Sequence, residues 1–84
     1  NMNKLVYISA TWCGPCKTFG PTMERVAGTG IPVQKVDADQ NQQVLADYQI
    51  RSVPAVVKVD SSGKMLDKFI GVRSMQEVVD FFNG

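Results

Sequence analysis

The sequence predicts an α/β domain in which a four-stranded mixed sheet is flanked by three helices, in the order β-α-β-α-β-β-α. Two observations carry this prediction: short, β-rich apolar runs alternate with segments whose apolar residues repeat at helical spacing. A third is the Asp-Ser-Ser-Gly stretch at residues 60–63, which predicts a tight antiparallel turn between the last two strands. Because 84 residues suffice for one core, we expect a single domain over residues 1–84.

The first half of the chain predicts a strand, a long helix and a second strand. Leu5–Ser9 is a continuous apolar run, which is typical of a strand buried on both faces. The long helix follows the two cysteines, is kinked at Pro21 and ends at the glycines of Gly28–Gly30. The second strand is predicted over Pro32–Asp39. The helix should bury one apolar stripe, made of Phe19, Met23, Val26 and Ala27.

The second half predicts a short helix and then two strands. Asp39 or Asn41 is the expected cap of the short helix. The two strands are predicted at Ala55–Val59 and Met65–Ile70, on either side of the tight turn. The apolar residues of the short helix are Val44, Leu45 and Tyr48.

The closing helix is predicted from a capping box, in which Ser74 and Glu77 bond each other's backbone amides. Its apolar side consists of Met75, Val78, Val79 and Phe82. The first β-α-β unit should be a right-handed crossover with parallel strands, and the last two strands should be antiparallel. In sheets of this kind, function gathers where strand carboxyl ends meet helix amino ends. Both cysteines lie at such a junction.

The charge pattern and the N-terminus exclude several function classes. Nine Lys and Arg residues face eight Asp and Glu, with no basic run or acidic tail, which argues against nucleic acid or a membrane surface as partner. No apolar run reaches the length of a membrane span, and the first residues lack the pattern of a secretory signal. We therefore expect a cytoplasmic protein, in whose compartment structural disulfides are rare.

The stretch Ala-Thr-Trp-Cys-Gly-Pro-Cys-Lys, residues 10–17, holds both cysteines. With Cys13 at the helix cap, free amides and the helix dipole would stabilise a thiolate, so the pKa of Cys13 should lie below that of free cysteine. Cys16, in the first turn, would then resolve a mixed disulfide formed by Cys13. Pro15 suits a first-turn position because it has no N–H to leave unpaired, and Gly14 allows a substrate to approach closely.

Two alternatives compete with this redox interpretation. A structural disulfide closing so short a loop would constrain the unfolded chain little. A zinc site normally needs four ligands, whereas this chain has two cysteines and no histidine, so it could only recruit carboxylates or a second molecule. A Cys-x-x-Cys that opens a helix in a β-α-β unit favours redox chemistry over both. We expect neither a metal nor a cofactor.

These motifs resemble the thioredoxin family from Leu5 through Phe82. The similarity rests on WCGPCK at Trp12–Lys17, a following proline, VQKVDADQN at residues 33–41, IRSVPAVV at residues 50–57, and IGV at residues 70–72. It implies a minimal thioredoxin fold, with Cys13 and Cys16 as catalytic residues and a cis peptide bond before Pro54. That bond would leave the Val53 backbone free to pair with an extended substrate. The implied substrate-binding patch consists of Trp12, Gly14, Pro15, Val53, Pro54, Gly71 and Val72.

The chain also departs from the family pattern. Typical thioredoxins begin with a further strand and helix, whereas this sequence starts at the strand that leads to the cysteines. Where relatives carry a buried aspartate, proposed to relay the proton of the second cysteine, this chain has Tyr7. Lys35, Tyr7 or a water molecule are the candidates for proton-transfer support in its place. A strand tyrosine is more often a core residue with a satisfied hydroxyl.

The resemblance implies a monomeric protein-disulfide reductase, oxidised by disulfide-containing proteins and recharged by a thioredoxin reductase. An alternative is a glutaredoxin-like protein recharged by glutathione; the short architecture favours it, but the Gly-Pro between the cysteines favours thioredoxin. A third hypothesis, from another class, is a protein clamp in which the cysteines are incidental. Replacing Cys13 by Ser separates the clamp from the enzymes, because only a clamp keeps its function.

Overall fold

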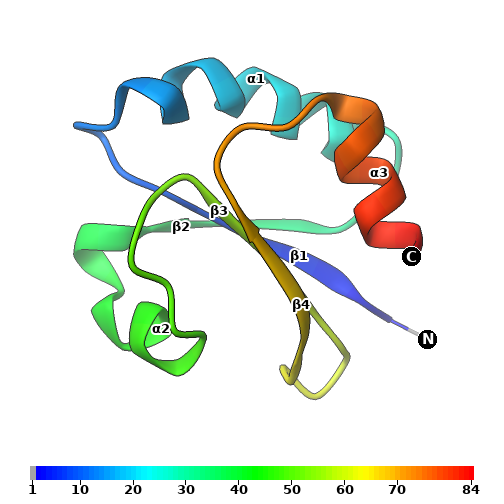
Figure 1. Cartoon of the computed structure of the whole chain (residues 1–84). Coiled ribbons are helices and arrows are strands. Elements are labelled where there is room, and N and C mark those ends of the chain that lie inside the picture. Colours follow the sequence, from blue (N-terminus) through cyan, green and yellow to red (C-terminus); the bar gives the residue numbers. More distant parts are fainter. Residues whose placement is uncertain (1) are drawn as a thin grey trace.

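The computed structural model describes residues 2–84 and has one sheet with the strand order β2-β1-β3-β4 (Figure 1). Strands β1 and β2 are parallel, and the other neighbouring pairs are antiparallel. The predicted order of elements and the mixed sheet are confirmed. The strands are β1 (Lys4–Ser9), β2 (Val33–Asp37), β3 (Ala55–Val59) and β4 (Met65–Ile70). The helices are α1 (Gly14–Gly28), α2 (Gln42–Asp47) and α3 (Met75–Asn83), with a short 3-10 helix, η1 (Ala38–Gln40).

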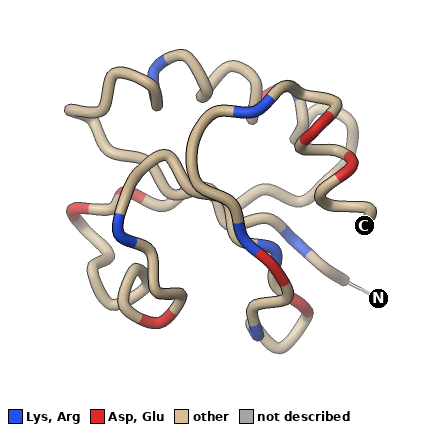
Figure 2. The backbone as a smooth tube through the Cα atoms, in the orientation of Figure 1, with Lys and Arg blue, Asp and Glu red and all other residues tan. Residues whose placement is uncertain are grey.

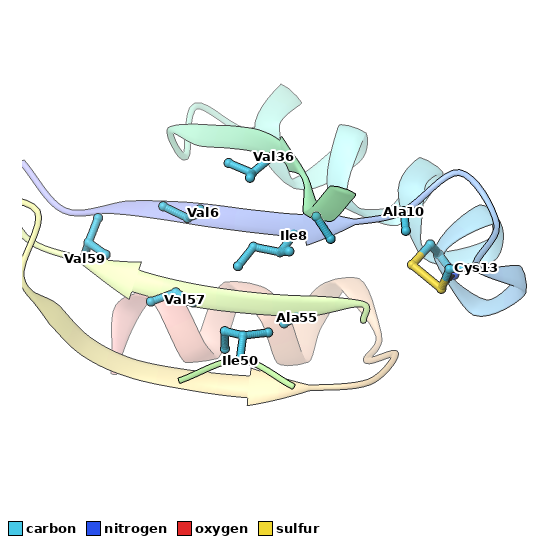
Figure 3. Packing of buried hydrophobic residues seen from close by; sticks show 11 residues of the cluster. Val6, Ile8, Ala10, Cys13, Val36, Ile50, Ala55, Val57 and Val59 are labelled. Carbon is cyan, nitrogen blue, oxygen red and sulfur yellow. Dashed lines mark hydrogen bonds between the residues drawn. A yellow bond between two sulfur atoms is a disulfide. The ribbon is translucent and has the colours of Figure 1, made fainter. Parts of the chain in front are cut away.

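Helices α1 and α3 cover one face of the sheet and α2 covers the other (Figure 1). Strand β1 serves both faces, since Leu5 and Tyr7 belong to the core under α1 and α3, while Val6 and Ile8 belong to the core on the α2 side. The predicted burial of this strand on two faces is therefore confirmed. Figure 3 shows the core on the α2 side, with the cysteine pair at one end of it.

Helix α1 begins directly after Cys13 and continues through Pro21. The stripe that it buries against the sheet consists of Cys16, Phe19, Met23 and Val26. The prediction that Ala27 belongs to this stripe is wrong, because Ala27 is exposed. It lies about 100° around the helix from the fully buried Val26, and that rotation turns it away from the sheet.

The segment after β2 differs from the prediction. The strand ends at Asp37 instead of Asp39, because the Asp37 carboxylate accepts a hydrogen bond of 2.9 Å from the Asp39 amide and starts η1. Asn41 occupies the N-cap position of α2 but makes no side-chain cap bond, and its Nδ2 donates to the Asp37 carbonyl at 3.0 Å. Asp39 does not cap α2 either, since the Asp39 position lies within η1. Tyr48 stands at the C-cap of α2.

The last helix is fixed at both ends. Its capping box is confirmed: Glu77 N–H donates to Ser74 Oγ at 3.2 Å, and Ser74 N–H donates to Glu77 Oε1 at 3.0 Å. At the other end, the buried Lys58 donates to the carbonyls of Phe81 and Gly84 at 3.1 and 2.9 Å. The cation of Lys58 thus satisfies carbonyls that a helix C-terminus leaves without partners. Across residues 2–84, the longest helices fall short of the length and hydropathy needed to cross a membrane.

Candidate active site

Cys13 and Cys16 are joined by a disulfide where β1 ends and α1 begins (Figure 3). Each side chain is 5% exposed, and the two Cα atoms lie 5.3 Å apart. Cys13 is the N-cap of α1, as predicted, and its Sγ accepts a hydrogen bond of 3.2 Å from the backbone N–H of Cys16. A sulfur in this position accepts a hydrogen bond from one of the backbone amides that the start of a helix leaves unpaired.

The loop before β3 lies against the disulfide, and the loop after β4 is hydrogen-bonded to that loop. The peptide bond between Val53 and Pro54 is cis, which confirms the expectation from the family resemblance. The Val53 carbonyl oxygen lies 3.7 Å from Cys13 Sγ. The Pro54 carbonyl accepts a hydrogen bond of 2.8 Å from the Gly71 N–H, and this bond places the loop after β4 beside the cis-proline. Gly71 has a φ of +98°, in the region that side chains rarely adopt, so glycine suits this position.

Trp12 directly precedes Cys13 and is 69% exposed. Its Nε1–H donates a hydrogen bond of 2.9 Å to Asp39 Oδ2, which fixes the indole ring toward η1. A carboxylate acceptor makes this a charge-assisted hydrogen bond. A hollow of about 190 Å³ lies beside the ring; we call it the Trp12 hollow. It is lined by Trp12, Ala38, Asp39, Gln42, Leu45, Arg51, Ser52 and Val53.

Cys16 borders a separate pocket of about 330 Å³, which we call the Cys16 pocket. Its walls carry two basic residues, Lys17 and Lys35, and two acidic ones, Glu24 and Asp37. The charges of the pocket are thus balanced. The remaining lining residues are Tyr7, Ser9, Ala10, Thr11, Cys16, Gly20 and Pro21.

Tyr7 forms the buried wall of the Cys16 pocket, with 3% of its surface exposed. Its ring packs edge-on against Phe19, with centroids 5.6 Å apart, and its hydroxyl donates to the Cys16 carbonyl oxygen at 3.3 Å. Burial raises the pKa of Tyr7 above its usual value, and a hydrogen bond with Ser9 only partly opposes this. Tyr7 is therefore a neutral donor, and its hydrogen bond holds the backbone of Cys16 instead of the sulfur.

The residues predicted from the sequence occupy three kinds of position. Val53 lies against Cys13 Sγ, and Pro54 and Gly71 follow through the cis peptide bond and the Gly71–Pro54 hydrogen bond. Trp12 directly precedes Cys13, and Gly14 and Pro15 are exposed at the start of α1. Val72 follows Gly71 and is 49% exposed. Tyr7 and Lys35 line the Cys16 pocket, Tyr7 from a buried position and Lys35 from an exposed one.

Two residues of the site were missed by the sequence reasoning. Asp39 was considered only as a helix cap, and Arg51 was not considered. The position of Asp39 just past the end of the second strand, at the same sheet edge as the cysteines, was the signal that could have identified it. Over residues 2–84, no group of three or more His, Cys, Asp or Glu side chains is placed to hold a metal ion.

A disulfide at the first turn of a helix, bordered by a cis-proline loop on an α/β sheet, defines the class of redox-active dithiol proteins. A family model described as Thioredoxin matches residues 1–84. The chain belongs to the thioredoxin family, and it is a thiol–disulfide oxidoreductase that reduces protein disulfides.

Individual relatives agree with the family model. The chain is 37% identical over 83 residues to a thioredoxin from Staphylococcus epidermidis, a match that covers 92% of this chain and 79% of the relative. It is 44% identical over 73 residues to a thioredoxin from Mycoplasmoides gallisepticum, covering 84% and 72% of the two chains. Among solved structures, a mutant thioredoxin from Halobacterium salinarum is similar with a TM-score of 0.88 and 31% identity, covering 99% of this chain and 74% of that one.

Proposed function

We propose that Cys13 is the attacking thiolate of this oxidoreductase and that Cys16 is the resolving thiol. The observation that carries the assignment is the hydrogen bond from the Cys16 N–H to Cys13 Sγ at the start of α1. An amide donor stabilises a thiolate more strongly than a thiol, so it favours ionisation of Cys13. Cys16 is part of the buried stripe of α1, from which it reaches its neighbour within the same helical turn.

The reaction has two displacement steps. The Cys13 thiolate attacks one sulfur of a substrate disulfide, the substrate S–S bond breaks, and the displaced substrate sulfur leaves as a thiolate that takes up a proton. Cys16 then loses its proton and attacks Cys13 Sγ, which releases the second substrate sulfur. The substrate gains two electrons and two protons, and the protein ends in the Cys13–Cys16 disulfide state. A reductase returns the two electrons and two protons.

For the substrate, we propose the patch formed by Trp12, Gly14, Pro15, Val53, Pro54, Gly71 and Val72. Its support is the position of the Val53 carbonyl, 3.7 Å from Cys13 Sγ, together with the exposed side chains of Trp12 and Val72. A substrate strand that pairs with the Val53 backbone would bring its disulfide close to Cys13, since backbone pairing positions a peptide without regard to its sequence.

For the proton of Cys16, we propose a route through the Cys16 pocket, with Lys35 as the supporting charge and Tyr7 as a positioning residue. The hydroxyl of Tyr7 donates to the Cys16 backbone and keeps its proton because burial raises the pKa of Tyr7. It is thus a poor base at neutral pH. The pocket, which Lys35 helps to line, leaves room for water to accept the proton.

We further propose that this single domain, residues 1–84, acts as a cytoplasmic monomer and that its partners are disulfide-containing proteins and a thioredoxin reductase. A balanced charge, with nine basic and eight acidic residues, supports the absence of nucleic acid and membrane surfaces from this set. The competing function is that of a glutaredoxin-like protein, which glutathione would recharge.

Reduction of insulin disulfides, followed by turbidity, tests the proposal. In one reaction NADPH and a thioredoxin reductase supply electrons, and in the other glutathione, NADPH and glutathione reductase do so. We expect turnover in the first reaction that is lost with Cys13→Ser. Turnover supported only by glutathione would replace the proposed function by the glutaredoxin-like alternative, and insulin reduction by the Cys13→Ser variant would contradict the role of Cys13.

A further inference from the structure

A second hollow, of about 510 Å³, adjoins the Trp12 hollow on the α2 side of the molecule. Leu45 and Arg51 line both, so the two are neighbours that share a wall. The second hollow lies between the end of α2 and strand β4; we call it the Lys68 hollow, after the residue of β4 that lines it. A polypeptide docked at Trp12 would reach this second hollow by passing over Leu45 and Arg51.

The Lys68 hollow is cationic. Arg51 and Lys68 line it, and none of its described lining residues is acidic. The adjoining Trp12 hollow has one acidic lining residue, Asp39, whose carboxylate accepts a hydrogen bond from Trp12 Nε1–H. This contrasts with the Cys16 pocket, where basic and acidic lining residues are equal in number. Over the described backbone as a whole, basic and acidic positions are interspersed (Figure 2).

The two cations are held in different ways. Lys68 Nζ donates to the carbonyls of Tyr48 and Gln49, both at 3.0 Å, so its charge is fixed at the end of α2. An ammonium has three N–H donors, and one remains for a ligand. Arg51 is exposed and stands two residues before Val53, on the segment that leads to the cis-proline. Arg51 lines the Trp12 hollow together with Val53, at whose backbone the substrate is proposed to pair, and the fork of a guanidinium matches a carboxylate.

We propose that the Lys68 hollow receives acidic side chains of the disulfide-bearing partner, a few residues away in sequence from the cysteine that Cys13 attacks. This inference rests on the proposed function and adds to it a class of substrate: proteins whose redox-active cysteine is followed or preceded by Asp or Glu. An extended strand advances about 3.3 Å per residue, so a segment paired at Val53 reaches past Arg51 within a few residues. Complementary charge raises the rate of encounter and disfavours basic partners.

Matched peptide disulfides test this proposal. Each peptide has one cysteine, which is joined by a disulfide to a small neutral thiol. It carries two Glu, two Gln or two Lys at three to seven residues from this cysteine. These residues precede the cysteine in one series and follow it in the other. The kcat/KM of reduction is measured for each at low salt and at 0.5 M salt. The variants are Arg51→Gln and Arg51→Glu, with Lys64→Gln in the β3–β4 turn as a control that removes the same charge elsewhere.

In one of the two series, we expect the Glu peptide to be reduced about three- to tenfold faster than the Gln peptide at low salt, and high salt should remove most of the preference. Arg51→Gln should lower the ratio of kcat/KM for the Glu peptide to kcat/KM for the Gln peptide. Arg51→Glu should shift the preference toward the Lys peptide, while Lys64→Gln should leave the wild-type ratio unchanged. Equal rates for the Glu and Gln peptides in both series, with turnover intact, would overturn this inference and leave the proposed function standing. A wild-type protein that reduces none of the peptides would overturn both.

Discussion

The two sulfurs of one disulfide face very different surroundings. On the Cys13 side lie the exposed Trp12, the Val53 carbonyl and the Trp12 hollow, which Arg51 also lines. On the Cys16 side lies a pocket of balanced charge, closed by the buried Tyr7. The cap position of Cys13 and the first-turn position of Cys16 produce this difference, because a cap residue stands outside the helix that its neighbour has already joined. We propose that substrates contact the Cys13 side of the pair and that proton transfer takes place on the Cys16 side.

The largest expected difference between the two sides comes from the cysteines themselves. Cys13→Ser should lower turnover by roughly a thousandfold or more, because the proposed attacking sulfur is removed. Cys16→Ser should also block turnover but should still react once, and it should accumulate a mixed disulfide between Cys13 and the substrate. Mass spectrometry after incubation with a disulfide protein distinguishes them. A trapped adduct in Cys13→Ser, with none in Cys16→Ser, would reverse the assignment.

On the Cys16 side, a carboxylate at position 7 should change the ionisation of the Cys16 sulfur. In Tyr7→Asp the new charge would raise the pKa of the Cys16 thiol through repulsion between like charges. The same group, when it accepts the proton, should speed resolution of the mixed disulfide by roughly tenfold or more. Thiol titration of the reduced protein and stopped-flow kinetics measure the two effects. Tyr7→Phe controls for packing. If Cys16 has the same pKa in Tyr7→Asp and in the wild type, the carboxylate at position 7 does not influence the Cys16 thiol.

On the Cys13 side, the hydrogen bond between Trp12 and Asp39 should matter for substrate contact. Asp39→Ala frees the indole ring, and we expect kcat/KM for a protein disulfide to fall about threefold to tenfold, mainly through KM. The chain has a single tryptophan, so its fluorescence reports the loosening of Trp12 directly. Asp80→Ala on α3 is the matched control. Unchanged kinetics and fluorescence in Asp39→Ala would mean that this hydrogen bond does not order the site.

The smallest expected effect is on stability at high pH. The pKa of Tyr7 is raised in the folded protein, so Tyr7 contributes stability that is complete below its unfolded value of about 10 and is lost as the pH rises through the folded pKa. Tyr7→Phe should destabilise the fold by about 1 kcal/mol at pH 7, since the Cys16 carbonyl loses its donor. The variant should lose less stability above pH 10 than the wild type does. Urea unfolding at several pH values measures both, and parallel pH curves for the two proteins would contradict this role of Tyr7.

Much of the fold follows from local sequence. The start of α1 at Cys13, the capping box at Ser74 and the two-faced burial of β1 depend on residues that are neighbours in the chain, so their pattern predicts them. The cis bond at Pro54 was expected only from the family resemblance, and the structure has it.

The rest depends on contacts between distant segments. The Trp12–Asp39 bond joins residues 27 positions apart, and no local pattern encodes it. Lys58 was predicted within an apolar strand, but only the arrival of the α3 terminus explains how its cation is satisfied in the core. The early end of β2 likewise follows from the Asp37 side chain competing with the strand for the backbone.

Alkylation of the reduced protein by iodoacetamide as a function of pH tests the central assignment most directly. We predict that Cys13 is modified before Cys16, that its pKa lies below the value of about 8.5 for free cysteine, and that at pH 7 it reacts roughly tenfold faster than free cysteine. A Cys13 that titrates and reacts as free cysteine does, or a faster reaction at Cys16, would contradict the account.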